Sequence, residues 1–282
     1  QEQSHLFADS GDTLQRLSGI NLVPLGQDRV CFTIKELREA YRASITGRVL
    51  NSIGCVVIES PVRRQSGQIV PFEELRSLTS FCREQGIPTH LDGARLFMMS
   101  AATGIPVRDY VSLFDSTYIS TWKYFGAPFG AILAGNAGFI EGLYHDRRMF
   151  GGSLPSASLA AGLTLEGVKG FEERFTAAMD KARSLFNDLN QLSVVSIQPF
   201  EHHSNIFPIC LAEDVDMTKL VEQLKDHSIF IFPPDTLLTN ELSGSSSSNK
   251  RRIDHRTTLT INTTILRQPN ETIVRAFKKA LR

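Results

Sequence analysis

Short runs of apolar residues that lack polar alternation constrain the fold of this chain most. The clearest run lies within 52–59 (SIGCVVIE), and a shorter one spans 130–135. Such a run indicates a buried strand whose two faces are covered by helices, as in a parallel sheet. Segments with helical spacing lie between the runs, for example 71–85 with Leu75 and Leu78. This alternation predicts an α/β fold with a largely parallel sheet and buried strands.

Two further predicted strands each end on a charged residue. The segment 88–91 leads into Asp92, and the segment 116–122 leads into Lys123. A turn that contains glycine follows each charged residue. In an open α/β sheet, ligands bind at the carboxyl ends of the strands. We therefore expect Asp92 and Lys123 to share a binding site.

The second half of the chain has a different sequence pattern. Residues 156–190 form a long helical pattern rich in alanine, leucine, glutamate and lysine, and short strand patterns follow it. With 282 residues, of which 41% are hydrophobic, the chain can build more than one core. We predict a large α/β domain over 1–155, a connecting helix over 156–190 and a small α+β domain over 191–282.

Composition excludes several classes of partner. Basic and acidic residues both number 30, so the net charge is zero, and no electrostatic capture of nucleic acid or of an anionic membrane is expected. No apolar run is long enough to span a membrane. The four cysteines lack the spacing of metal ligands, which favours a reduced, cytoplasmic setting and no metal site. A small molecule is the expected partner.

The residue types at the two strand ends suit one kind of chemistry. A lysine half-buried among aromatic neighbours loses proton affinity and can form a Schiff base, and a carboxylate can pair with the ring nitrogen of pyridoxal phosphate. Asp92 as a phosphotransfer nucleophile is disfavoured, because Ala94 stands where a second acid is needed. A dehydrogenase pair of Tyr118 and Lys123 is disfavoured too, because their separation is five residues and no GxGxxG precedes them.

Three segments of the chain carry a family resemblance. They are 90–97 (HLDGARLF), 120–131 (STWKYFGAPFGA) and 150–155 (FGGSLP). These segments resemble the low-specificity L-threonine aldolases, which belong to the β-eliminating-lyase group of fold-type I pyridoxal phosphate enzymes. The resemblance implies a mainly parallel sheet with helices on both faces and a small C-terminal α+β domain. It also implies a lyase of amino acid metabolism that cleaves a β-hydroxy-α-amino acid to glycine and an aldehyde.

The resemblance also implies roles for individual residues. Lys123 would form the imine with pyridoxal 5'-phosphate, and Asp92 would pair with the ring nitrogen. His5 would stack on the face of the cofactor and handle a substrate proton. Arg95 would bind near the cofactor phosphate or the substrate carboxylate, and Ser120 would contact the phosphate. A homodimer or homotetramer is the assembly expected from the resemblance.

The chain departs from the family in two places. The family carries a Ser-Gly-Thr phosphate loop upstream of the position of Ser4, so we expect this sequence to lack the N-terminal part of a longer protein. The family's two carboxylate-binding arginines are replaced by Pro155 and Leu259. The loop after the first apolar run has gained Arg63 and Arg64. Our hypothesis is that one of these two arginines binds the substrate carboxylate, or that the substrate is not an ordinary α-amino acid.

These departures leave two alternatives to threonine aldolase chemistry. One is a pyridoxal phosphate enzyme with an altered substrate or reaction, either β-elimination or transamination, because the cofactor stabilises the carbanions of all these reactions alike. The other is a non-catalytic paralogue of the family.

Overall fold

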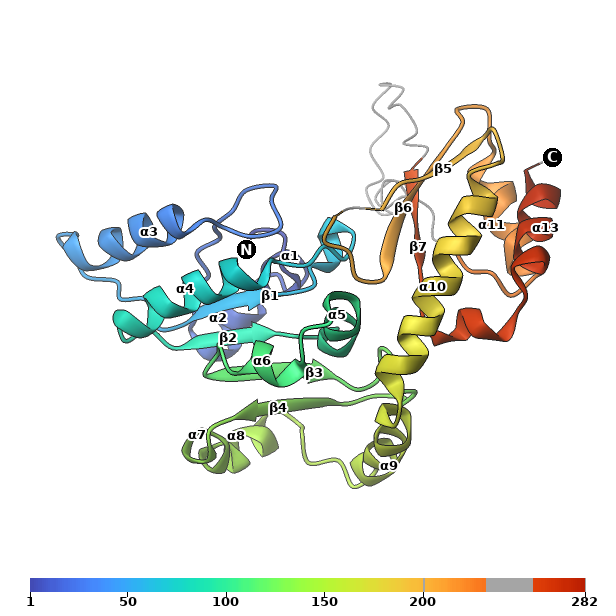
Figure 1. Cartoon of the computed structure of the whole chain (residues 1–282). Coiled ribbons are helices and arrows are strands. Elements are labelled where there is room, and N and C mark those ends of the chain that lie inside the picture. Colours follow the sequence, from blue (N-terminus) through green and yellow to red (C-terminus); the bar gives the residue numbers. More distant parts are fainter. Residues whose placement is uncertain (200, 232–255, 282) are drawn as a thin grey trace. The chain divides into compact units, whose positions relative to one another are not determined.

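The computed structural model describes residues 1–199, 201–231 and 256–281 (Figure 1). The chain divides into two compact units, which comprise residues 1–173 and 174–282. The residues discussed below as a candidate site all belong to the first unit.

The first unit is built on a four-stranded sheet with the strand order β1-β2-β3-β4. The strands are β1 (Val56–Glu59), β2 (Thr89–Asp92), β3 (Ser116–Ser120) and β4 (Ala131–Gly135). The first three strands run parallel, and β4 pairs antiparallel with β3. The mainly parallel sheet predicted from the sequence is therefore confirmed.

Short helices connect and cover these strands. They are α1 (His5–Ala8), α2 (Thr13–Ser18), α3 (Ile34–Thr46), α4 (Phe72–Glu84), α5 (Leu96–Thr103), α6 (Val107–Val111), α7 (Ala137–Gly142), α8 (Tyr144–Met149) and α9 (Ala157–Val168). A 3₁₀ turn, η1 (Arg63–Gln65), follows β1. In Figure 1, α4 and α6 lie in front of the sheet.

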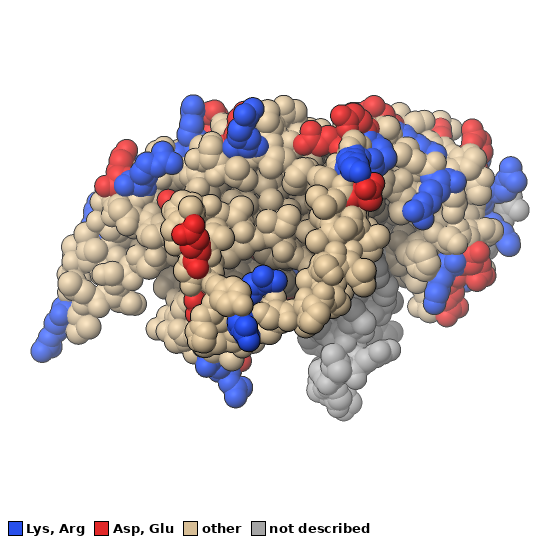
Figure 2. Space-filling view, turned by 90° about the horizontal axis from the view of Figure 1, so that it is seen from below, with Lys and Arg blue, Asp and Glu red and all other residues tan. Residues whose placement is uncertain are grey.

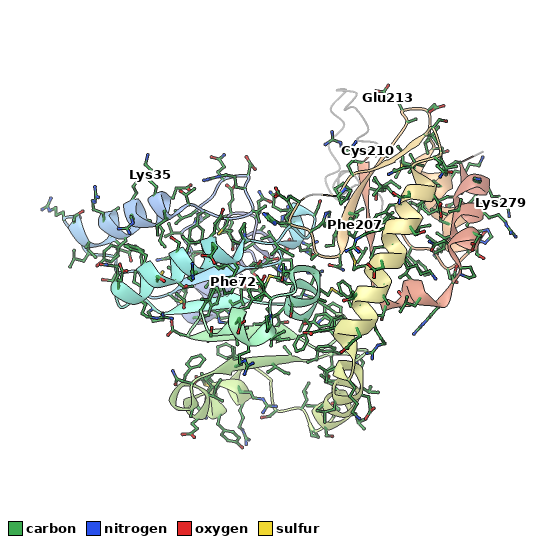
Figure 3. All side chains as sticks on the ribbon, viewed as in Figure 1. Lys35, Phe72, Phe207, Cys210, Glu213 and Lys279 are labelled. Atoms are coloured by element: carbon green, nitrogen blue, oxygen red, sulfur yellow. The ribbon has the colours of Figure 1, made fainter. Side chains whose placement is uncertain are left out.

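One face of the sheet packs into the hydrophobic core. Ile58, Leu91 and Ile119 supply this face from the three parallel strands, and all three are buried. They belong to one cluster with residues of α3 to α6, namely Leu37, Leu75, Leu78, Phe81, Leu96, Met99 and Tyr110. Phe72, labelled in Figure 3, starts α4 and packs edge-on against Tyr110 with ring centroids 5.3 Å apart. Burial of these side chains is the main stabilising contribution to the unit.

The opposite face of the same strands is polar. Successive side chains of a strand point to opposite faces, so the residues that alternate with the core positions share the second face. They include Glu59 on β1, His90 and Asp92 on β2, and Tyr118 and Ser120 on β3. These strands are covered on their second face as well, since Glu59 and Ser120 are buried, but the residues there are polar rather than apolar. The polar face is where the charged strand ends lie.

β4 differs from its prediction in burial. The sequence 130–135 predicts a buried strand, and a strand is present, but all five of its residues are exposed. Ile132 and Leu133 are 46% and 43% exposed. Within the described part of the chain, β4 pairs with β3 alone and forms the edge of the sheet. An apolar run indicates a strand, but it does not indicate whether a neighbour covers that strand.

The second unit contains an antiparallel sheet and three helices among its described residues. The strands β5 (Val195–Ile197), β6 (Ile206–Leu211) and β7 (Arg256–Thr260) pair in sequence order. The helices are α10 (Phe171–Leu189), which begins in the first unit, α11 (Met217–Lys225) and α13 (Asn270–Ala280), and a 3₁₀ turn, η2 (Thr263–Arg267), precedes α13. Phe207 of β6, labelled in Figure 3, stacks on His203 with ring centroids 4.1 Å apart. This is the small α+β arrangement expected at the C-terminal end.

Surface charge is mixed rather than segregated. Figure 2 shows acidic and basic side chains interspersed on one face of the molecule, and neither sign dominates that face. Among the described residues, no three or more His, Cys, Asp or Glu side chains are grouped so that they could hold a metal ion. None of the helices that the structure describes is long and apolar enough to cross a membrane.

Candidate functional site

The carboxyl ends of the three parallel strands align in one row. The register pairs Glu59 with Asp92 and Asp92 with Tyr118. Lys123 lies in the turn that follows β3. The charge of Asp92 acts to raise the pKa of Lys123, so the two charged residues that the sequence singles out lie within electrostatic range of each other. Sequence reasoning from the apolar runs was sufficient to find this pair.

The Lys123 side chain is only partly exposed to solvent. Burial lowers the pKa of Lys123, and the Arg95 guanidinium lowers it further, while the carboxylates of Asp92 and Glu59 act in the opposite direction. Its Nζ lies 5.8 Å from the centroid of the Trp122 ring. A lysine in such surroundings reaches its neutral, nucleophilic form at a lower pH than an exposed lysine does.

The turn after β2 fixes the position of Asp92. Its Oδ1 accepts a hydrogen bond from the backbone N–H of Ala94 at 3.2 Å. The N–H of Gly93 donates to the carbonyl oxygen of Tyr118 at 2.9 Å, which ties the turn to β3. A side chain at Gly93 would crowd this contact, because a Cβ there would lie 3.1 Å from the same oxygen. Asp92 is thereby held beside the end of β3.

Arg95 and Ser120 lie close to this pair. Burial lowers the pKa of Arg95, and the charge of Glu59 raises it. The Ser120 side chain is fully buried, and its Oγ has no hydrogen-bond partner within normal geometry. The Tyr118 hydroxyl group is a polar neighbour of this Oγ: burial and the charge of Asp92 raise the pKa of Tyr118, and a hydrogen-bonding interaction with Ser120 acts to lower it. Ser120 therefore presents a buried hydroxyl group that a ligand could engage.

His5 and the two arginines predicted from the sequence meet at a residue that the sequence did not single out. Asp9 accepts from Nδ1 of His5 at 2.8 Å, from Nη2 of Arg63 at 2.7 Å and from Nη1 of Arg64 at 3.0 Å. The charge of Arg63 contributes to the lowered pKa of Lys123. The only sequence signal for Asp9 is its spacing of four residues from His5, which places both on one helix face.

Glu59 is the second residue that sequence reasoning missed. Its side chain is buried, and its two oxygens accept from the backbone N–H groups of His5 at 2.5 Å and Arg63 at 2.9 Å. The side chain of Gln1 donates to the carbonyl oxygen of Glu59 at 2.8 Å and accepts from its N–H at 2.7 Å. Glu59 could have been found in the same way as Asp92, because it is the acid at the end of an apolar run.

Comparison with known proteins places the chain in a family. The family model for beta-eliminating lyases matches residues 1–210. A low-specificity L-threonine aldolase from Candida albicans is 33% identical over 156 residues, which is 55% of this chain and 41% of that protein. A low-specificity L-threonine aldolase from Saccharomyces cerevisiae is 35% identical over 102 residues, which is 36% of this chain and 26% of that protein. The chain thus spans less than half the length of these two curated relatives.

Solved structures show the same likeness in three dimensions. A structure from Exiguobacterium, described as an aromatic amino acid beta-eliminating lyase/threonine aldolase, has a TM-score of 0.77 and 25% identity, covering 99% of this chain and 73% of that one. A structure from Listeria monocytogenes described as an L-allo-threonine aldolase has a TM-score of 0.73 and 27% identity, covering 100% and 74%.

These likenesses agree with the segments that first suggested the family and with the parallel strand ends described above. The fold is that of the fold-type I pyridoxal phosphate enzymes, as predicted. The cofactor that the family and the fold indicate is pyridoxal 5'-phosphate. The chain belongs to the beta-eliminating lyase family.

Proposed function

We propose that this chain is part of a pyridoxal phosphate-dependent lyase that cleaves a small β-hydroxy-α-amino acid between Cα and Cβ, yielding glycine and an aldehyde. The observation that carries the proposal is that Asp92 and Lys123 lie at the carboxyl ends of adjacent parallel strands and within electrostatic range of each other. The threonine aldolases among the similar proteins support the choice of substrate class.

The residues at the strand ends suit this cofactor. Lys123, whose charged form is disfavoured by burial, would hold the aldehyde group of the cofactor. Asp92 would pair with its ring nitrogen, and the buried hydroxyl group of Ser120 would donate to its phosphate. Arg95 adds a positive charge beside them. The chemistry that the cofactor supplies when bound is an electron sink for negative charge at the substrate Cα.

We assign the binding of the substrate carboxylate to Arg63 rather than to Arg64. Both guanidinium groups are partly exposed and both pair with Asp9, so each can turn toward a ligand. The charge of Arg63 is among the causes that lower the pKa values of both Lys123 and Arg95, which supports a position near the reacting groups. Arginine is suited to this role because its planar fork binds a carboxylate through two hydrogen bonds.

His5 is the residue that we propose for proton removal. When the Cα–Cβ bond breaks, the β-hydroxyl oxygen becomes the aldehyde oxygen and must release its proton to a base. His5 can accept this proton, because a neutral imidazole has one nitrogen with a free electron pair. Its side chain is 58% exposed, so a ligand can reach it. A proton returned to Cα then completes glycine.

The proposal is tested by supplying pyridoxal phosphate and L-threonine to the purified protein and measuring glycine and acetaldehyde. We expect a visible absorbance band from the bound cofactor and aldehyde release, both lost in Lys123→Ala. With L-threonine as substrate, 2-oxobutanoate and ammonia in place of glycine would favour elimination, and a 2-oxo acid that keeps the 3-hydroxyl group would favour transamination. A band without any turnover would favour a non-catalytic paralogue, and no band at all would refute the role of Lys123.

We also propose an assembly and a location for the protein. One is assembly as a homodimer or homotetramer, which the measured mass of the protein in solution would test. The other is a cytoplasmic location.

A further inference from the structure

Asp9 connects three side chains that the proposed function uses separately. Its Oδ2 accepts from His5 and Arg63, and its Oδ1 accepts from Arg64. The Asp9 side chain is 21% exposed, compared with 58% for His5, so the carboxylate is the best shielded member of the cluster. Two arginines and one aspartate leave a formal charge of +1, which matches a single substrate carboxylate.

Glu59 ties together the same two segments at the level of the backbone. Its buried carboxylate accepts from the N–H of His5, which begins α1, and from the N–H of Arg63, which begins η1. Asp9 links the side chains of these two residues. The geometry of His5 relative to Arg63 is therefore fixed at the backbone and again at the side chains.

The ionisation of Asp9 decides which nitrogen of His5 carries the hydrogen. Burial acts to raise the pKa of Asp9, but the hydrogen bonds from His5 and Arg63 and the charges of both arginines prevail and lower it to about 2. Asp9 is thus a carboxylate at neutral pH and can only accept hydrogen bonds. The Nδ1 of His5 must then be the donor, and in the neutral ring Nε2 carries the electron pair.

We propose that Asp9 is a positioning residue that fixes the tautomer and the orientation of His5, so that Nε2 is the nitrogen presented to the β-hydroxyl of the substrate. This inference rests on the proposed function for its catalytic meaning. The tautomer itself is a property of the chain and can be measured without cofactor or substrate. Asp9 also holds Arg63 and Arg64 next to the base, so one carboxylate sets both the proton acceptor and the anion-binding group.

The test is nitrogen NMR of the histidine side chains at an alkaline pH at which the imidazole is neutral. The protein has seven histidines, and the signal of His5 is identified by its loss in His5→Gln. We expect Nδ1 of His5 to carry the hydrogen in the wild-type protein. We expect Asp9→Ala to shift His5 toward the Nε2–H form, which free histidine prefers. Asp12→Ala is the matched control, since Asp12 is 67% exposed and pairs only distantly with Arg16, at 3.8 Å.

Two NMR results would overturn the proposed role of Asp9. An Nε2–H tautomer in the wild-type protein overturns the proposal, and this result does not depend on whether a variant folds. A folded Asp9→Ala protein that keeps the Nδ1–H form also overturns it.

In the aldolase assay we expect Asp9→Ala to lower kcat by about 10²-fold, the lower end of the contribution of a general base, with a smaller change in KM. A wild-type protein with the expected tautomer but no aldehyde release would refute the proposed function while the role of Asp9 in positioning His5 stands.

Discussion

Glu59 and Asp92 occupy paired positions at the carboxyl ends of β1 and β2, so two carboxylates are neighbours on the polar face of the sheet. Burial raises the pKa of Glu59 and outweighs the hydrogen bonds from the backbone N–H groups of Arg63 and His5, which lower it; the charge of Asp92 adds to the rise. Asp9 shows the opposite behaviour, because its hydrogen bonds to cations lower its pKa to about 2. The two acids that hold His5 and Arg63 should therefore respond to pH in opposite directions.

Glu59 should make the protein less stable as the pH rises. Folding favours its protonated form, so its contribution declines as the pH increases from the ordinary value of 4.5 through the raised folded-state pKa. Glu59→Gln, which is neutral at every pH, should lack this decline, although it loses an acceptor for one backbone N–H at a cost of about 1–3 kcal/mol. Urea unfolding across the acidic to neutral range measures both effects. The exposed control Glu39→Gln should keep the wild-type slope, and an unchanged slope in Glu59→Gln would contradict the prediction.

Asp9 should make the protein more stable above its ordinary pKa. A carboxyl group with a lowered folded-state pKa contributes stability that is present above 3.8 and is lost as the pH falls to about 2. Asp9→Asn should therefore be less stable than the wild type at neutral pH, with a difference that shrinks on acidification. Denaturant midpoints measured between neutral and strongly acidic pH check this. A difference that stays constant with pH would show that the ionised carboxylate is not the cause.

Gly167 should tolerate no side chain. A Cβ at this position of α9 would lie 1.9 Å from the carbonyl oxygen of Phe125, so the helix or the turn after β3 would have to move. We expect Gly167→Ala to lower the free energy of unfolding by about 1–3 kcal/mol. Gly162→Ala in the same helix is the control, since nothing lies within 4 Å of its added Cβ. The control should gain up to about 1 kcal/mol from helix propensity, and equal effects of the two variants would refute the steric argument.

Ser120 should add little stability in the absence of cofactor and contribute affinity in its presence. A buried hydroxyl group without a well-formed hydrogen bond is unfavourable by up to about 1–3 kcal/mol, and Ser120 has only the nearby Tyr118 hydroxyl group as a weak partner among the described residues, so Ser120→Ala should leave the cofactor-free protein about as stable as the wild type. The same change should weaken pyridoxal phosphate binding by about 10-fold, through loss of one hydrogen bond to a charged phosphate. Ser116→Ala is the opposite case, because its Oγ lies 2.8 Å from Nδ1 of His90. Ser116→Ala should lower the stability of the protein and leave its affinity for the cofactor unchanged. Cofactor titration followed by absorbance distinguishes Ser116→Ala from Ser120→Ala.

Arg63 and Arg64 form a matched pair for testing substrate binding. Arg63→Ala should raise KM for the amino acid by about 10- to 100-fold, the value of hydrogen bonds to a charged group, while kcat changes less. Arg64→Ala should have a small effect on KM, although it also removes one positive charge and one ion pair with Asp9. Steady-state kinetics of the two variants provide the comparison. A larger KM effect in Arg64→Ala would reverse the assignment, and no effect in either would remove both from the substrate site.

Local patterns in the sequence were sufficient for the sheet and for its most important pair of charges. The runs that end at Asp92 and Lys123 are continuous segments, so their strand character and their polar ends can be read directly. Asp9 could not be identified in that way, because its proposed role depends on contacts to Arg63 and Arg64, which are 54 and 55 residues away in the sequence. Contacts at such separation depend on how β1 and α1 are brought together, and no local pattern records this.

The exposure of β4 has a consequence for the behaviour of the protein in solution. An edge strand with free backbone hydrogen-bonding groups and apolar side chains is a template for pairing with another chain. Within the described residues, β4 is an edge strand and exposes the apolar side chains of Ile132 and Leu133. Pairing between copies of the described chain at this edge is therefore expected, and a lysine in place of the exposed Leu133 should oppose it at little cost to the core.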